Sequence, residues 1–88
     1  MSLNNTIFIE NLPKLDIHGL DQKAAEYYIN QFINERVELN ELMVVIIHGI
    51  GQKILLKKTH ETLKNNKKVI EFKTWNYNEG ITIVYLKN

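Results

Sequence analysis

The sequence predicts an α/β fold, a two-layer sandwich with the element order β-α-β-α-β-β, in which a four-stranded mixed sheet carries both helices on one face. Two observations support this prediction. Apolar residues recur at helical spacing in two stretches, and short runs of β-branched residues lie before, between and after them. A strand–helix–strand unit makes parallel neighbours through a right-handed crossover, whereas the last two strands are close enough in sequence for an antiparallel hairpin.

The length of 88 residues allows one domain with a modest core. We expect an N-terminal arm over residues 1–13, whose Ile7-Phe8-Ile9 segment docks on the body, and a single domain over residues 14–88. The absence of cysteine excludes a disulfide framework and fits a cytoplasmic protein. No apolar run approaches the roughly 20 residues of a membrane span, and no signal peptide is expected, so we expect no membrane partner.

In the first half of the chain, residues 14–18 form a short strand that ends at Gly19. Asp21 can cap the following helix, which runs to about Arg36. Its apolar stripe consists of Ala24, Ala25, Tyr28, Ile29, Phe32 and Ile33. The continuous apolar run at residues 42–47 predicts a strand in the centre of the sheet.

In the second half, a helix is expected over residues 52–65. Its predicted inward positions are Leu55, Thr59, Thr62 and Leu63. Residues 69–74 alternate between apolar and polar, which is typical of an edge strand. Residues 75–80 are expected to form a hairpin loop, and residues 81–86 a second central strand.

Two histidines stand at equivalent places, because His18 and His48 each end one of the two predicted parallel strands and each precedes a glycine. Ligands bind beyond the carboxyl ends of parallel strands, and neighbouring strands lie about 4.8 Å apart. The two imidazoles could therefore share one patch of surface. Asp16 lies on the same strand face as His18 and could orient its ring or hold it protonated. The alternative is that each histidine caps its strand or packs inside.

Gly49 and Gly51 let the backbone approach a ligand closely and would present amides at a helix N-terminus, which favours phosphate. The P-loop pattern is absent. Trp75 and Tyr77 would emerge at the same edge of the sheet, either to pack the hairpin or to stack on bases. His60 is expected to be solvated. Two histidines without a third ligand make a poor zinc site, so no metal ligands are assigned.

The net charge of +1 conceals a local asymmetry, because residues 53–73 hold seven lysines and two glutamates. A local positive field can steer a polyanion. The candidate nucleic-acid contacts are Lys53, Lys57, Lys58 and Lys64. The alternative is a solvated, lysine-rich helix face.

The segments LDIHG, VIIHGIG and EGITIVYL, in this order, resemble the Smr (small MutS-related) domain family. The resemblance covers about residues 15–86 and is strongest for the version at the C-terminus of bacterial MutS2 proteins, so the chain could be part of a larger MutS2-like protein. It implies a fold like the C-terminal domain of bacterial translation initiation factor three. It also implies binding of branched or structured DNA, or of RNA, nicking endonuclease activity, and a role in DNA repair or recombination.

The motifs of that family match this chain residue by residue. LDxH matches Asp16 and His18, HGxG matches His48, Gly49 and Gly51, and the glycine of the late turn matches Gly80. Four features depart from the pattern. Ile50 stands where the family often has lysine, Lys53 where glycine is common, and Leu56 where arginine is frequent, and the double glycine of the late turn is reduced to Asn78-Glu79-Gly80. Lys53 and Lys57 could replace the lost phosphate contacts, as point charges.

The expected function is therefore that of a nucleic-acid-binding domain and hydrolase that nicks a phosphodiester strand. His18 or His48 would act as general acid or base, with Asp16 in support, while the glycine amides and Lys53 would stabilise the transition state. No cofactor is required, although Asp16 and one histidine could help hold a divalent ion such as magnesium. The alternative is a non-catalytic nucleic-acid-binding or protein-interaction module, which needs only the lysine field.

Overall fold

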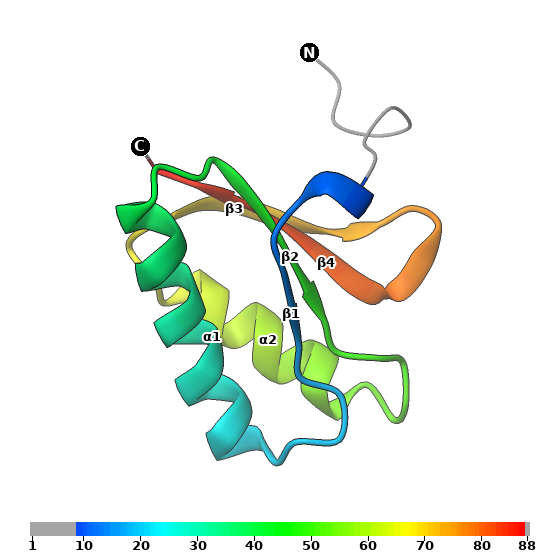
Figure 1. Cartoon of the computed structure of the whole chain (residues 1–88). Helices are drawn as coiled ribbons and strands as arrows, with labels where there is room; N and C mark the ends of the chain where they lie inside the picture. The colour runs from blue at the N-terminus through cyan, green and yellow to red at the C-terminus, as the bar shows by residue number, and fades with distance from the viewer. Residues whose placement is uncertain (1–8, 88) are drawn as a thin grey trace.

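The structure, a computed structural model, describes residues 9–87 of the chain. Its elements are a 3-10 helix η1 (Ile9–Asn11), β1 (Lys14–Asp16), α1 (Gln22–Glu38), β2 (Met43–Ile47), α2 (Ile54–Lys64), β3 (Val69–Trp75) and β4 (Asn78–Leu86) (Figure 1). The predicted order of strands and helices is confirmed.

The four strands form one mixed sheet in the order β1-β2-β4-β3. β1 and β2 are parallel, while β4 runs antiparallel to both β2 and β3. The central positions of β2 and β4 and the edge position of β3 are as predicted. β3 therefore runs in the same direction as β1 and β2, and the carboxyl ends of all three strands lie at one edge of the sheet.

Both helices cover one face of the sheet (Figure 1). Ile29 and Ile33 of α1 and Leu63 of α2 pack there against Val44 and Ile46 of β2. Complete burial of each such side chain contributes about 1.5–3 kcal/mol. The core is thus one apolar layer between the helices and the sheet.

α1 begins as its sequence predicts, because the Asp21 carboxylate accepts a hydrogen bond of 2.8 Å from the Ala24 amide. The apolar stripe predicted for this helix was too wide, because it included Tyr28. Tyr28 is 48% exposed and packs edge-on against Tyr27. The buried seam follows every fourth residue, and one step along a helix turns the side chain by about 100°, which takes Tyr28 away from the sheet.

The opposite face of the sheet carries a smaller apolar cluster, in which Ile9 and Leu12 pack with Val45, Ile81 and Ile83. Strand alternation sends Val45 to this face and its two neighbours to the helical face. The segment just before β1 therefore lies against the back of the sheet. Ile7 and Phe8, which belong to the predicted docking segment, lie outside the described residues.

Three predicted boundaries were wrong. β1 ends at Asp16, two residues early, although Ile17 still donates a 2.8 Å hydrogen bond to Ile47. α2 begins at Ile54 rather than residue 52, because Lys53 has a left-handed φ of 67° that interrupts a helix. The expected loop at residues 75–80 shrinks to a tight turn, since Trp75 pairs with Asn78 across the hairpin. Within residues 9–87, no helix is long and apolar enough to span a membrane.

Candidate functional site

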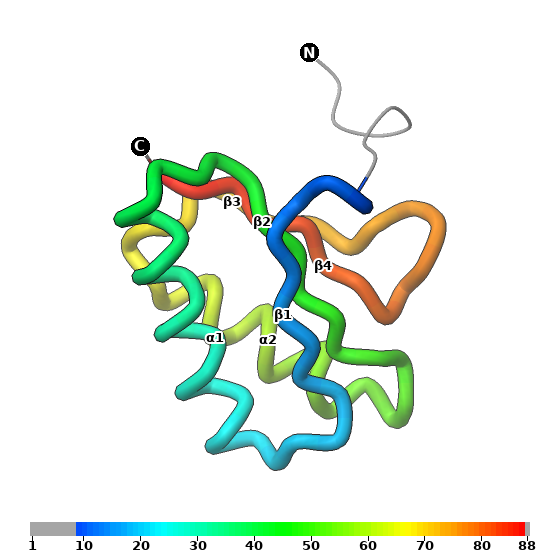
Figure 2. Tube along the Cα trace, viewed as in Figure 1, coloured from blue at the N-terminus to red at the C-terminus, as the bar shows by residue number. Residues whose placement is uncertain are grey.

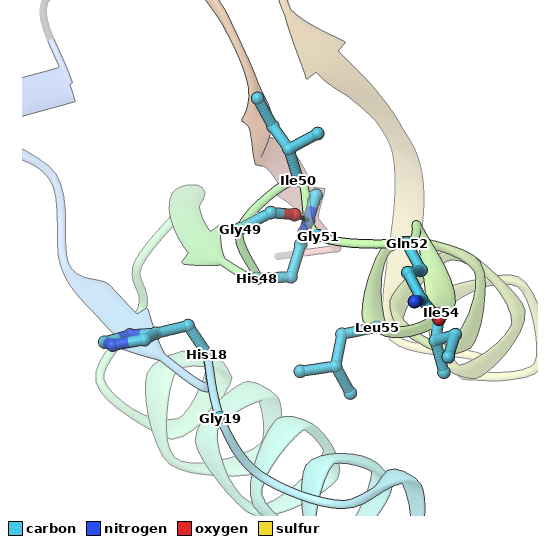
Figure 3. Close-up of a pocket in the computed structure, with 9 residues that line it drawn as sticks. All are labelled: His18, Gly19, His48, Gly49, Ile50, Gly51, Gln52, Ile54 and Leu55. Atoms are coloured by element: carbon cyan, nitrogen blue, oxygen red, sulfur yellow. Dashed lines mark hydrogen bonds between the residues drawn. The ribbon is translucent and has the colours of Figure 1, made fainter.

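An open pocket of about 390 Å³ lies at the carboxyl edge of the sheet. Its lining comes from the loop after β1, the loop after β2 and the first turn of α2, and consists of His18, Gly19, His48, Gly49, Ile50, Gly51, Gln52, Ile54 and Leu55 (Figure 3). The Cα trace shows the two loops side by side at this end of the sheet (Figure 2). The parallel strands therefore bring both histidine-glycine motifs to one place, as the sequence predicts.

His18 lies on the surface of this site, with 71% of its side chain exposed. Its Nδ1 is 2.5 Å from Asp16 Oδ1, which also accepts a 3.1 Å hydrogen bond from the His18 amide. The hydrogen bond from the His18 ring lowers the pKa of Asp16, so this carboxyl is ionised at neutral pH. Because Nδ1 faces Asp16, Nε2 is the ring nitrogen left for an external partner. In Figure 3 the ring points away from the other lining residues.

His48 is only 3% exposed. Its Nδ1 lies 2.9 Å from the Gly49 carbonyl oxygen and its Nε2 lies 2.8 Å from Thr82 Oγ1. Burial lowers the pKa of His48, and the hydrogen bond to Gly49 opposes this effect. The expected solvent-facing patch shared by two imidazoles is therefore not formed, because the ring of His48 is buried beside Thr82 of β4 and His60 of α2.

His60 was expected to be solvated, and this expectation was wrong. Its ring is half-buried on α2, 4.9 Å from the ring of Phe72, and its Nε2 lies 3.0 Å from Thr82 Oγ1. Burial lowers the pKa of His60, and the nearby His48, whose ring centroid is 6.2 Å away, lowers it further. The sequence signal for this contact is Thr82, a polar residue within the apolar run of the last strand.

The lack of a side chain at Gly80 lets β4 pass close to the loop after β2. Its carbonyl oxygen accepts hydrogen bonds from the amides of His48 (2.9 Å) and Gly49 (3.0 Å). A Cβ at this position would lie 3.0 Å from the Cα of Gly49, which is tighter than most Cβ contacts, so the Gly49 backbone would have to shift by a few tenths of an ångström. The Gly49 amide, which was expected to face a phosphate, is thus already occupied.

Other amides of this loop remain available. Among residues 9–87, no acceptor is found for the amides of Ile50, Gly51 or Gln52. The first turn of α2 adds further unpaired amides, as every helix start does, and Lys53 makes no side-chain cap. The positive end of the helix and these amides together form a surface that suits an anion.

The predicted lysine contacts separate into distinct places. Lys53 precedes α2 beside the pocket, and Lys57 lies one turn further along. The Lys58 ammonium lies 3.3 Å from Glu26 and 3.5 Å from Glu61, an arrangement that links α2 to α1. These carboxylates raise the pKa of Lys58. Lys64 stands in the last turn of α2, about 16 Å along the helix axis from Lys53.

Trp75 and Tyr77 lie on the β3–β4 hairpin, with ring centroids 5.2 Å apart in an edge-on arrangement. Trp75 packs against the apolar cluster on the back of the sheet, whereas Tyr77 is exposed. Neither residue lines the pocket.

The pocket does not supply a complete set of metal ligands. Within residues 9–87, no group of three or more histidine, aspartate or glutamate side chains is arranged to hold an ion. Asp16 is the carboxylate beside the pocket, and one of its oxygens is already held by His18. A magnesium ion here would need its remaining ligands from water and from a substrate phosphate.

Comparison with known proteins agrees with this geometry. The model of the Smr domain family matches residues 15–87, nearly all of the described chain. The chain belongs to the Smr domain family. Its curated relatives include proteins named endonuclease MutS2 from Clostridium tetani (31% identical over 77 residues, 84% of this chain) and Clostridium botulinum (34% over 82 residues, 90% of this chain). The Smr domain described here spans about 10% of the length of these relatives.

Two solved structures are similar in fold. The crystal structure of the Smr domain of Thermus thermophilus MutS2 matches with a TM-score of 0.85 and 25% identity, covering 88% of this chain and all of that one. YdaL, a stand-alone small MutS-related protein from Escherichia coli, matches with a TM-score of 0.74 and 19% identity over 85% of this chain and 64% of its own. The expected resemblance to the Smr domain of MutS2 proteins is confirmed.

Proposed function

We propose that this Smr domain binds branched or structured DNA, or RNA, at the pocket and nicks one strand with the Asp16–His18 pair. The observation that carries the proposal is the placement of this pair. A solvent-exposed imidazole, oriented by a carboxylate 2.5 Å away, stands at the lip of a pocket lined by unpaired amides. Relatives of the chain are named endonucleases, which supports the same class of reaction.

The phosphate would sit against the loop after β2. The amides of Ile50, Gly51 and Gln52 and the positive end of α2 would donate to its oxygens. Lys53 and Lys57 add positive charge beside them. This arrangement replaces the sequence-based expectation in which the Gly49 amide made the contact.

His18 would act as the general base. In its neutral form, Nε2 would take a proton from an attacking water, whose oxygen forms the new bond to phosphorus as the bond to the leaving oxygen breaks. Asp16 would stabilise the imidazolium that results. His48 is less suited to this step, because it is buried and both of its ring nitrogens already have partners. A magnesium ion held by Asp16 and the substrate phosphate would add charge at the same place.

A second candidate function is binding without cleavage. Ile50, which is 51% exposed at the mouth of the pocket, stands where the family often carries a lysine. Loss of that charge weakens stabilisation of the transition state more than it weakens binding by the remaining lysines.

The test is a cleavage and binding assay of the purified protein on a DNA three-way junction and a structured RNA, with magnesium and with chelator. We expect a nick that disappears in His18→Asn, and an affinity that falls steeply with salt because each phosphate contact releases counterions. Binding without any cut would establish the second candidate. Failure to bind either nucleic acid would refute both.

A further inference from the structure

A continuous series of hydrogen bonds connects the interior of α2 to the loop at the pocket. It begins at His60 Nε2, passes through Thr82 Oγ1 at 3.0 Å, and reaches His48 Nε2 at 2.8 Å. From the other nitrogen of His48 it continues to the Gly49 carbonyl at 2.9 Å. Two imidazoles from different elements thus share one hydroxyl.

Donor counting fixes the direction of every bond in this series. The Gly49 carbonyl can only accept, so His48 must carry its proton on Nδ1. The neutral ring then has a bare Nε2, which accepts the single proton of the Thr82 hydroxyl. Thr82 can therefore only accept from His60, whose proton must be on Nε2. All bonds in the series point from His60 towards Gly49, so each one polarises the next.

The end of the series determines how the loop presents its amides. A trans peptide unit is planar, and its carbonyl and amide point in opposite directions. Because His48 holds the Gly49 carbonyl, the amide of Ile50 must point away from the buried ring. Ile50 lines the pocket, and its amide has no acceptor among residues 9–87.

We propose that Thr82 and His60 are positioning residues, which hold His48 as the Nδ1-protonated tautomer so that the Gly49–Ile50 peptide presents the Ile50 amide to a phosphate oxygen. This inference rests on the proposed function, since it assumes that the loop binds phosphate. His48 is then part of the binding site through the backbone, without touching the ligand. A purely structural role would leave the Ile50 amide and its response to phosphate unchanged when the Thr82 hydroxyl is removed.

The first test uses the free protein and needs no nucleic acid. Nitrogen-15 NMR of the two rings separates protonated from bare nitrogens. We expect His48 protonated on Nδ1 and His60 protonated on Nε2 at pH 7.5. Both rings in the same tautomer, or His48 protonated on Nε2, would overturn the inference.

The second test removes the shared hydroxyl. Thr82→Val should move the amide resonance of Ile50, abolish its shift on addition of inorganic phosphate, and weaken binding to a fluorescein-labelled DNA three-way junction about tenfold, as for one hydrogen bond to a charged group. Thr82→Ser should restore both. The matched control is Thr59→Val on α2, which removes a buried hydroxyl that has no hydrogen-bond partner among residues 9–87 and should leave affinity unchanged.

If Thr82→Val does not fold, His60→Leu replaces it, with His60→Gln as the conservative variant that keeps a donor near Nε2. Leucine should weaken binding and glutamine should preserve it. Equal affinity in all four variants of Thr82 and His60 would overturn the inference. Failure of the unsubstituted protein to bind the junction would instead overturn the proposed function. The two tautomers and the response of the Ile50 amide to inorganic phosphate would still decide the inference.

Discussion

The tripeptide Ile-His-Gly occurs twice in this chain, and the two copies have opposite fates. At the end of β1, His18 projects into solvent beside Asp16. At the end of β2, His48 is buried and both of its ring nitrogens are hydrogen-bonded within the protein. The position of a strand in the sheet, rather than the local sequence, therefore decides what chemistry the residue after it can perform.

The cause lies in the neighbours of each strand. β1 is an edge strand that pairs with β2 alone, and the ring of His18 contacts Asp16 of its own strand while most of it stays exposed. β2 has β4 on its other side, and that strand supplies Gly80 to the backbone of His48 and Thr82 to its ring. One histidine is thereby left free to exchange a proton, and the other is fixed in one orientation.

The largest effect should come from the exposed histidine. We expect His18→Asn or Asp16→Asn to lower the cleavage rate by about 10²- to 10⁴-fold, because a general acid or base contributes on that scale. Both side chains are exposed, so the free energy of unfolding should stay within about 0.5 kcal/mol of the original. Single-turnover cleavage and urea denaturation provide the two measurements, and a large loss of stability in either variant would weaken the comparison.

Substitution of the buried histidine, in contrast, should mainly lower the stability of the fold. His48→Ala leaves a cavity and deprives Thr82 and the Gly49 carbonyl of their partner, which should cost about 2–4 kcal/mol in the free energy of unfolding. His18→Ala is the matched control, with the same substitution at the equivalent strand end. A similar urea midpoint for both variants would show that the environments differ less than the structure indicates.

Acid should destabilise the folded protein through its buried and half-buried histidines, His48 and His60. The folded-state pKa values of His48 and His60 are lowered below 6.5 by burial, so the unfolded chain binds more protons as the pH falls. The stability that depends on neutral rings is complete above about pH 6.5 and is lost as the pH drops towards the lowered values. The free energy of unfolding, measured by urea denaturation at pH 7 and pH 5, should therefore fall less between these pH values in His60→Gln than in Thr59→Val. Equal losses would contradict the burial of His60.

The smallest effect concerns Lys53, whose left-handed φ of 67° is unfavourable for a residue with a Cβ. Lys53→Gly should raise the free energy of unfolding by up to about 1 kcal/mol, since glycine adopts this conformation without strain. The same change should weaken nucleic-acid binding and reduce its salt slope by about one contact. Lys57→Ala removes the same charge from within the helix and should lack the gain in stability.

Much of the fold follows from local patterns. Apolar periodicity identified both helices and the central strands, because burial imposes its period on neighbouring residues. Alternation along a strand also placed Asp16 beside His18, two residues apart on one face. This part of the site could be predicted because its two residues are only two positions apart in the sequence.

The rest of the site depends on contacts between distant segments. His60 and Thr82 are 22 residues apart, and Thr82 and His48 are 34 residues apart. Nothing in the local pattern of α2 predicts that His60 meets a hydroxyl on β4. The ion pair of Lys58 with Glu26 depends in the same way on how two helices pack, so the sequence suggested a free lysine.

The most direct test of the two roles compares His18→Asn with His48→Asn in single-turnover cleavage of a DNA three-way junction at saturating protein. Asparagine cannot act as an acid or base near neutral pH, but at residue 48 its amide can still donate to the Gly49 carbonyl. We expect His18→Asn to lose at least about 10²-fold in rate while His48→Asn stays within about tenfold of the original. An equal or larger loss in His48→Asn would show that the exposed histidine is not the one that transfers the proton.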